Sequence, residues 1–218
     1  MKILVIAPHP DDEVLGCGGT ISKFIKEGHR VLLCIVTKAY TPDWSETYIE
    51  EKKVEIDASN KILGIHETIF LNYPTVKLDT IPRKEFNDLI CKTVGNVNPD
   101  IMFIPHKGDL NFDHEIVHNA CLVAARPVKN SIKKILVYET LSETEWNPQG
   151  TPFIPNIFFN IEPFLDLKLS AMKAYKSEVR VFPHPRSLES IEALARKRGS
   201  DAGFNYAEAF MLIRERVF

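Results

Sequence analysis

Short apolar runs recur along the chain, and longer segments of mixed polarity separate them. A short apolar run that no polar residue interrupts is typical of a strand buried on both faces of a parallel sheet. The runs predict strands at residues 2–7, 30–36, 68–72, 100–105 and 134–139. The remaining segments predict helices at residues 16–27, 48–63, 80–95, 113–125, 165–177 and 187–198.

Polar residues and glycine mark where several of these helices begin and end. Thr80 is expected to cap the third helix, with Pro82 in its first turn, and Asp113 to cap the fourth. Gly64 is placed to end the second helix. Strands that alternate with helices predict an α/β fold with a mainly parallel sheet flanked by helices. The 218 residues suffice for a single domain, 1–218, and no shift in composition divides them.

Two longer segments, 38–48 and 140–156, interrupt the alternation. Loops of this length are usually functional or disordered. Each follows a predicted strand, so both should lie at the carboxyl edge of the sheet, where open α/β folds bind their ligands. They carry Trp44, Tyr48 and Trp146. These rings either stack on a sugar or only pack the loops down, and the sequence leaves both interpretations open.

The composition narrows the classes of function. Hydrophobic residues make up 44% of the chain and charged residues 26%, with a formal net charge of −2, which is typical of a soluble globular protein. No basic stripe suggests nucleic acid as a partner, and no apolar run approaches the roughly 20 residues of a membrane span. The four cysteines are scattered, which argues against a thiolate zinc site and favours a cytoplasmic protein with reduced thiols.

The stretch PHPDDE (8–13) follows the first predicted strand directly. It places one histidine and three acids at the carboxyl edge of the sheet, on a backbone that two prolines stiffen. Imidazole and carboxylate together suit a divalent zinc ion. A hydrolytic zinc site needs three protein ligands and one open position, and His9 and Asp12 supply two of them.

The third ligand should be a histidine at the end of another strand. GDLNFDH (108–114) follows the fourth predicted strand and ends where a helix begins, so His114 can reach a metal held beside the first strand. Asp11 then lies next to a ligand without being one. It is free to act as a general base toward the attacking water.

A competing pattern overlaps this site, because His114, Glu115 and His118 form the His-Glu-x-x-His motif of zinc peptidases. That interpretation leaves PHPDDE (8–13) without a role. A third interpretation is a sugar-binding module whose metal is not catalytic, although a structural zinc usually has four protein ligands.

GCGG (16–19) does not match the dinucleotide-binding pattern, and its glycines more simply let the helix approach the metal loop closely.

The chain resembles the PIG-L/LmbE-like deacetylases, which hydrolyse N-acetyl groups of glucosamine-containing substrates. The resemblance runs almost end to end and rests on APHPDDEVLGCGGT, EKKVEIDASNKILGI, GDLNFDHEIVHNACLVAARP and the tail AYKSEVRVFPHPRS…RGS…AEAF. It implies a Rossmann-like fold and one zinc ion per subunit. It also implies that His9, Asp12 and His114 bind the zinc and that Asp11 is the base.

The chain departs from the pattern of this family at two positions. Many members carry a histidine where this chain has Asn111, and that histidine is thought to stabilise the oxyanion. Many carry an arginine where this chain has Lys52, a point charge without the planar fork of arginine. The segment FPHPRS (182–187) offers a replacement for the missing histidine. We therefore expect His184 to be catalytic, with Arg186 beside it to bind a substrate hydroxyl or an anionic group.

The resemblance extends to the partners. The ligand is expected to be a small N-acetylated sugar or sugar conjugate, and the chain to form a homo-oligomer such as a hexamer. In related ring-shaped deacetylases a late histidine reaches the zinc site, sometimes from a neighbouring subunit. The residues expected to contact substrate are Lys52, Asn111, Arg186, Trp44 and Trp146.

Overall fold

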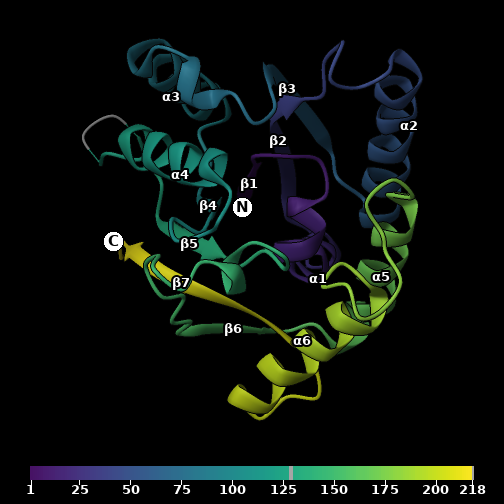
Figure 1. Ribbon diagram of the computed structural model, residues 1–218. Coiled ribbons are helices and arrows are strands. Elements are labelled where there is room, and N and C mark those ends of the chain that lie inside the picture. The colour runs from purple at the N-terminus through teal and green to yellow at the C-terminus, as the bar shows by residue number, and fades with distance from the viewer. Residues whose placement is uncertain (128–129, 218) are drawn as a thin grey trace.

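The computed structural model describes residues 1–127 and 130–217 and shows one seven-stranded sheet with helices on both faces (Figure 1). The strands lie in the order β3-β2-β1-β4-β5-β7-β6. They are β1 (Lys2–Ala7), β2 (Arg30–Lys38), β3 (Glu67–Pro74), β4 (Ile101–Pro105), β5 (Lys134–Tyr138), β6 (Ile157–Asn160) and β7 (Ala207–Glu215). The helices are α1 (Asp12–Lys26), α2 (Glu46–Leu63), α3 (Arg83–Val97), α4 (Phe112–Ala124), α5 (Leu165–Ala174) and α6 (Leu188–Ala202), and the 3₁₀ turns are η1 (Leu78–Thr80), η2 (Thr144–Trp146) and η3 (Glu162–Phe164).

The predicted strands form the parallel part of the sheet, from β3 to β5, which confirms the expected α/β fold. Beyond β5, the strands β7 and β6 extend the sheet in antiparallel orientation. The apolar runs did not predict this pair. β6 has four half-buried residues, and β7 changes from buried to exposed along its length. Neither strand therefore shows the uninterrupted apolar run of a central strand.

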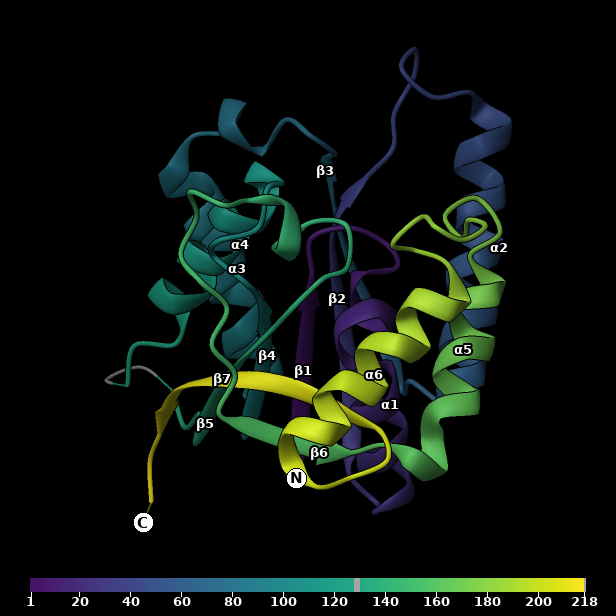
Figure 2. The same cartoon turned by 60° about the horizontal axis from the view of Figure 1, so that its bottom comes forward.

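Two helical layers cover the sheet, and alternate residues of each central strand contact them. Ile3 and Val5 of β1 belong to a hydrophobic core that also contains residues of α1, α2, α5 and α6. Leu4 and Ile6 point to the opposite face, into a core shared with α3 and α4. Figure 2 shows the two groups of helices on opposite sides of the strands. None of the helices in the described part of the chain is long and apolar enough to cross a bilayer.

The predicted N-caps of two helices differ from those in the structure. Thr80 ends the turn η1, and Pro82 occupies the N-cap position of α3 instead. The N-cap of α4 is Asn111, whose side chain accepts a hydrogen bond from the N–H of Asp113. Asp113 itself lies inside the helix, and its carboxylate is used elsewhere.

The glycines of α1 permit close packing against the sheet and η3 rather than against the metal loop. A Cβ atom on Gly16 would lie 2.3 Å from Cδ2 of Tyr138, and one on Gly19 would lie 2.8 Å from Ile161. Tyr138 is fully buried and donates a hydrogen bond of 2.9 Å to the carbonyl oxygen of Ile6, so its ring cannot move aside easily. The N-terminal half of α1 thus rests directly on β5.

We predict that Gly16→Ala destabilises the protein by about 1–3 kcal/mol, because the added methyl group overlaps the Tyr138 ring. Gly95→Ala is the matched control. Its Cβ would meet nothing within 4 Å, and replacing glycine inside α3 should stabilise the fold by up to about 1 kcal/mol. Urea unfolding of both variants with a metal chelator present measures the difference. Equal effects of the two substitutions would contradict the packing argument.

Candidate metal centre and its pocket

β1 and β4 lie side by side in the sheet, although β2 and β3 separate them along the chain. The strand order reverses between them, since β2 and β3 follow on one side and β5 on the other. The carboxyl ends of parallel strands at such a reversal form the crevice in which open α/β folds bind ligands. The loop after β1 leads to Asp12 at the start of α1, and the loop after β4 leads to His114 in the first turn of α4.

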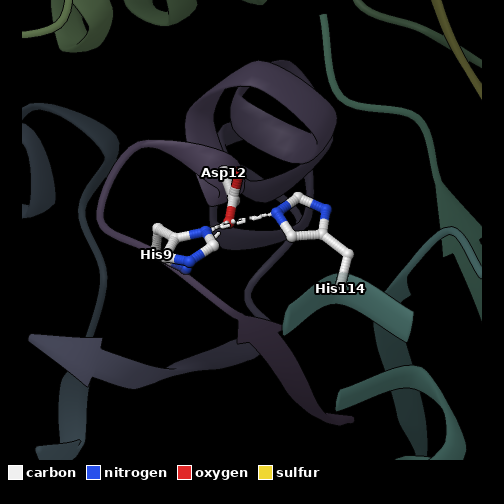
Figure 3. Close-up of side chains that lie close together, drawn as sticks. All are labelled: His9, Asp12 and His114. Atoms are coloured by element: carbon white, nitrogen blue, oxygen red, sulfur yellow. Dashed lines mark hydrogen bonds and ion pairs between the residues drawn. The ribbon is translucent and has the colours of Figure 1, made fainter. Parts of the chain in front are cut away.

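Three side-chain atoms converge in this crevice (Figure 3). His9 Nδ1 lies 3.3 Å from Asp12 Oδ2, His114 Nε2 lies 3.3 Å from the same oxygen, and the two nitrogens are 3.3 Å apart. Ligand atoms about 2.0–2.1 Å from a tetrahedral zinc ion lie about 3.3–3.4 Å from one another. The triad therefore has the spacing of three corners of such a tetrahedron. Among the described residues, no other group of His, Cys, Asp and Glu side chains is arranged to hold a metal.

A further carboxylate stands behind each histidine. Asp109 Oδ2 lies 2.7 Å from His114 Nδ1, and its other oxygen accepts a hydrogen bond of 2.6 Å from the hydroxyl of Thr144 in η2. An imidazole that donates from Nδ1 to a carboxylate keeps the lone pair of Nε2 for a metal. Asp109 thus fixes both the orientation and the tautomer of His114 that metal binding needs.

Asp113 does the same for His9. Its Oδ2 lies 3.1 Å from His9 Nε2, while the backbone N–H groups of Val76 and Leu78 donate to the carboxylate at 2.7 and 3.3 Å. Asp109 and Asp113 are not among the residues predicted for the site. The available signal was their position, because both lie within the six residues that end at His114.

The carboxylates make the crevice attractive to positive charge. Burial lowers the pKa of His9, but hydrogen bonds to Asp113 and Asp12 outweigh burial and raise it to about 9. Burial also lowers the pKa of His114, and the charges of Asp12 and Asp109 raise it well above its usual value. Burial raises the pKa of Asp12, yet the two histidines hold it far below its usual range. A metal ion that binds here would displace the protons from the imidazoles and supply the positive charge among these groups in their place.

Asp11 is the N-cap of α1, which begins earlier than expected so that Asp12 is its first residue. Its φ of 112° is uncommon for a residue with a Cβ atom, and its N–H donates to Glu13 Oε2 at 3.1 Å. Glu13 in turn accepts a hydrogen bond of 2.7 Å from the Tyr175 hydroxyl. Burial and the charge of Asp12 raise the pKa of Asp11 well above that of a free carboxyl, and Arg186 opposes this shift. A raised pKa makes the carboxylate a stronger base.

Glu178 joins the two basic residues predicted to contact substrate. Lys52 Nζ lies 2.6 Å from Glu178 Oε1, and Arg186 Nη1 lies 2.8 Å from Glu178 Oε2. The hydroxyl of Tyr48 donates to Glu178 Oε1 at 3.0 Å, and Glu55 lies 3.3 Å from the Lys52 ammonium group. Burial raises the pKa of Glu178, but Lys52 and Arg186 more than offset burial and lower it. Both cations are therefore held by carboxylates of the chain itself.

A pocket of ≈ 250 Å³ opens beside the triad. Four of the residues predicted to contact substrate line it, namely Lys52, Asn111, Arg186 and Trp44. The Oδ1 atom of Asn111 accepts the hydrogen bond that caps α4, at 3.1 Å. The NH₂ group at the other end of this amide is a donor of the kind that a developing oxyanion needs.

Trp146 and His184 lie outside the lining of this pocket. Trp146 belongs to η2 and is 60% exposed. His184 is exposed on the loop before α6, where its Nδ1 atom accepts a hydrogen bond of 3.0 Å from the backbone N–H of Arg186. Within one chain the structure does not bring either side chain to the triad, so their predicted roles depend on a second subunit or on loop movement.

The His-Glu-x-x-His pattern is divided by the fold. His114 belongs to the triad, whereas His118 Nδ1 is 2.9 Å from the carbonyl oxygen of Pro105, and burial lowers the pKa of His118. Glu115 lines a separate groove between α3 and α4. The geometry thus favours the triad with His9 and Asp12 over the peptidase arrangement.

A mainly parallel sheet with a His-Asp-His triad that could hold a metal, and with a buried carboxyl beside the triad, is the arrangement expected of a hydrolase that uses a metal ion. Comparison with known proteins agrees. The family described as GlcNAc-PI de-N-acetylase (PIG-L) matches residues 4–125, more than half of the chain. The uncharacterized deacetylase YaiS of Escherichia coli K12 is 32% identical over 184 residues, which cover 80% of this chain and 90% of that protein. The chain therefore belongs to the PIG-L family.

Solved structures show the same fold over nearly the whole chain. The conserved protein TT1542 from Thermus thermophilus superposes with a TM-score of 0.80 and 25% identity, covering 99% of this chain and 96% of that one. The N,N′-diacetylchitobiose deacetylase from Pyrococcus horikoshii superposes with a TM-score of 0.77 and 24% identity, covering 97% and 83%. The strands added after β5 are thus part of a fold that related chains share.

We predict that His9→Ala, Asp12→Ala and His114→Ala each lose most of the bound zinc, because each removes one of three protein ligands. His118→Ala, a change of the same kind one helical turn away, should retain it. Atomic emission after dialysis measures how much zinc each variant retains. Loss of zinc in His118→Ala together with retention in His9→Ala would restore the peptidase arrangement.

Proposed function

We propose that the protein is a zinc-dependent de-N-acetylase that hydrolyses the acetamide of an N-acetylglucosamine-containing substrate to acetate and a free amine. The observation that carries this proposal is the position of Asp11. It is a buried carboxyl with a raised pKa that lines the pocket together with His9 and Asp12, two of the three donors of the triad. Membership of the PIG-L family supports the same chemistry.

The residues of the pocket divide the work of amide hydrolysis. When bound, the zinc ion supplies a Lewis acid that polarises the amide carbonyl and lowers the pKa of the attacking water. Asp11 accepts the proton of that water and can deliver it to the leaving nitrogen, so that one carboxyl serves as base and then as acid. Asn111 donates a hydrogen bond to the carbonyl oxygen as negative charge develops on it. Arg186, with its Nη1 atom 3.5 Å from Asp11 Oδ2, orients the base.

Zinc is the metal we favour, with one ion per subunit. Two imidazoles and one carboxylate form a mixed nitrogen and oxygen donor set, and the spacing of 3.3 Å fits tetrahedral coordination. A cytoplasmic location is part of the proposal, since all four cysteines are free thiols, as a reducing compartment maintains them.

The decisive experiment is acetate release from a panel of N-acetylglucosamine derivatives, with and without a chelator. Hydrolysis that the chelator abolishes and zinc restores supports the proposal. Zinc binding with no turnover of any N-acetyl sugar would favour a sugar-binding module with a metal that is not catalytic. Cleavage of peptide bonds without acetate release would favour the peptidase.

Asp11→Asn should retain zinc, because Asp11 is not one of the three donors, and should lower kcat by about 10²–10⁴-fold, the usual contribution of a general base. The measurement is kcat for acetate release at matched zinc content. Glu50→Gln, which removes an exposed carboxylate on α2, is the control and should be fully active. Near-normal turnover by the zinc-loaded Asp11→Asn protein would assign the base to another group.

We also propose a homo-oligomer in which His184 of one subunit serves the site of another. Its exposed position and its absence from the pocket lining are compatible with a role across an interface. The neighbouring Val181 and Phe182 are 86% and 61% exposed, and apolar side chains on the same loop suit a subunit contact.

If the site is shared, His184→Ala should bind zinc normally and lose on the order of 10²-fold in kcat, the scale for one oxyanion donor. Mixing inactive Asp11→Asn with inactive His184→Ala protein should then restore part of the activity after subunit exchange. Sedimentation analysis gives the assembly size. Full activity of His184→Ala alone would remove His184 from the mechanism.

A further inference from the structure

The two basic side chains that line the described pocket, Lys52 and Arg186, are both occupied. Lys52 Nζ contacts Glu178, Glu55 and the hydroxyl of Ser177. The guanidinium of Arg186 lies 2.8 Å from Glu178, 3.5 Å from Asp11 and 3.7 Å from Glu143, and its Nε atom donates to Ser142 Oγ. Neither cation can bind an anion of the substrate without leaving carboxylates of the chain unpaired.

The charges of the pocket balance once a divalent ion is bound. Four carboxylates line it, and they belong to Asp11, Asp12, Glu143 and Glu178. With all four ionised, two positive charges from a divalent ion held by the triad and one each from Lys52 and Arg186 would equal these four negative charges. Asp109 and Asp113, behind the histidines, add further negative charge. The loaded site therefore has no surplus positive charge for a phosphate or carboxylate.

A cation that follows a lining residue is occupied as well. Lys77 follows Val76, which lines the pocket, and its ammonium group lies 3.5 Å from Asp43 and 4.2 Å from the centre of the Tyr40 ring. The uncharged part of the pocket offers other contacts, since Trp44 and Tyr48 stand in the lining together with threonine hydroxyls. Aromatic faces and neutral hydrogen-bonding groups are what an uncharged sugar needs.

We infer that the substrate is an uncharged N-acetylglucosaminide, such as a short oligosaccharide or a neutral glycoside, and not a phosphorylated or carboxylated conjugate. This inference rests on the proposed function and narrows its substrate class. An anionic substituent would face Glu143 and Glu178, and recruiting Arg186 would leave these half-buried carboxylates without their partner.

Two matched pairs of substrates test the inference. The first is methyl N-acetylglucosaminide against N-acetylglucosamine 1-phosphate, and the second is N,N′-diacetylchitobiose against an N-acetylglucosaminyl malate. Within each pair the neutral compound should have the higher kcat/KM, by at least about tenfold, because like charges disfavour the anion. A higher kcat/KM for the anionic member of both pairs would overturn the inference and leave the deacetylase function intact.

A substitution that removes one carboxylate tests whether electrostatic repulsion causes the substrate preference. Glu143→Gln keeps the shape of the side chain and removes one of the four carboxylates, so the preference for the neutral substrate should shrink several-fold. Glu50→Gln removes an exposed charge outside the pocket and should leave the preference unchanged. An unchanged ratio in Glu143→Gln would overturn the electrostatic explanation.

A binding measurement separates this inference from the proposed activity. Calorimetry with zinc-loaded protein compares methyl glucoside with glucose 1-phosphate, since neither carries an amide to hydrolyse. Inorganic phosphate is titrated in parallel to reveal direct binding to the metal. If the neutral sugar binds preferentially but no acetamide is hydrolysed, the proposed deacetylase activity is refuted and the preference for an uncharged ligand is supported. Tighter binding of glucose 1-phosphate than of both other probes would refute the substrate class.

Discussion

The pairing of β1 with β4 is the constraint on which the site depends. His9 and Asp12 belong to the loop and helix after β1, and His114 belongs to the helix after β4. Only the adjacency of these two strands, at the point where the strand order reverses, brings the three donor atoms to mutual distances of 3.3 Å. The buried apolar residues of both strands hold this register, so the hydrophobic core determines the geometry of a polar site at its edge.

Burying so many carboxylates imposes a second constraint. Asp11, Asp12, Asp109 and Asp113 are each at most 4% exposed and lie around two histidines. Removing an ion from water costs several kcal/mol unless an opposite charge and hydrogen bonds compensate. Backbone N–H groups compensate part of this cost, and the positive charge among the carboxylates compensates the rest. The same arrangement that creates a metal site therefore makes the folded chain depend on a cation, either protons on the imidazoles or a metal ion.

The sequence predicts those features that appear as a repeated pattern of residues or as a compact motif. Uninterrupted apolar runs identify β1 to β5, and the compact stretch around His9 and Asp12 indicates a candidate metal loop because it places three acids and a histidine directly after a strand. His114 was predicted as the third ligand because it starts a helix after the fourth predicted strand, and the pairing of β4 with β1 brings it to His9 and Asp12. The antiparallel β6 and β7 lack the run that a doubly covered strand shows, and they escaped prediction for that reason.

Contacts between distant segments set the limit of prediction at the site. The resemblance to the deacetylases suggested substrate contacts at Asn111 and Lys52, two positions where the chain was expected to depart from the family pattern. In the structure Lys52 is surrounded by acceptors from α2 and from the segment after α5. A compact ammonium with three donors suits such a cluster, whereas the planar fork of arginine suits two parallel acceptors.

Lys52 holds Glu178 in place, and Glu178 in turn contacts Arg186, while the predicted contact of Lys52 with substrate stays a prediction. Glu178 holds Arg186 by one oxygen and Lys52 by the other, and Arg186 lies against Asp11. A single carboxylate therefore connects the orientation of the base with the charge that a substrate meets in the pocket. Releasing Arg186 to bind an anionic substrate would also disturb the environment of Asp11, so the proposed selectivity for an uncharged ligand and the proposed role of Asp11 as base depend on the same contacts.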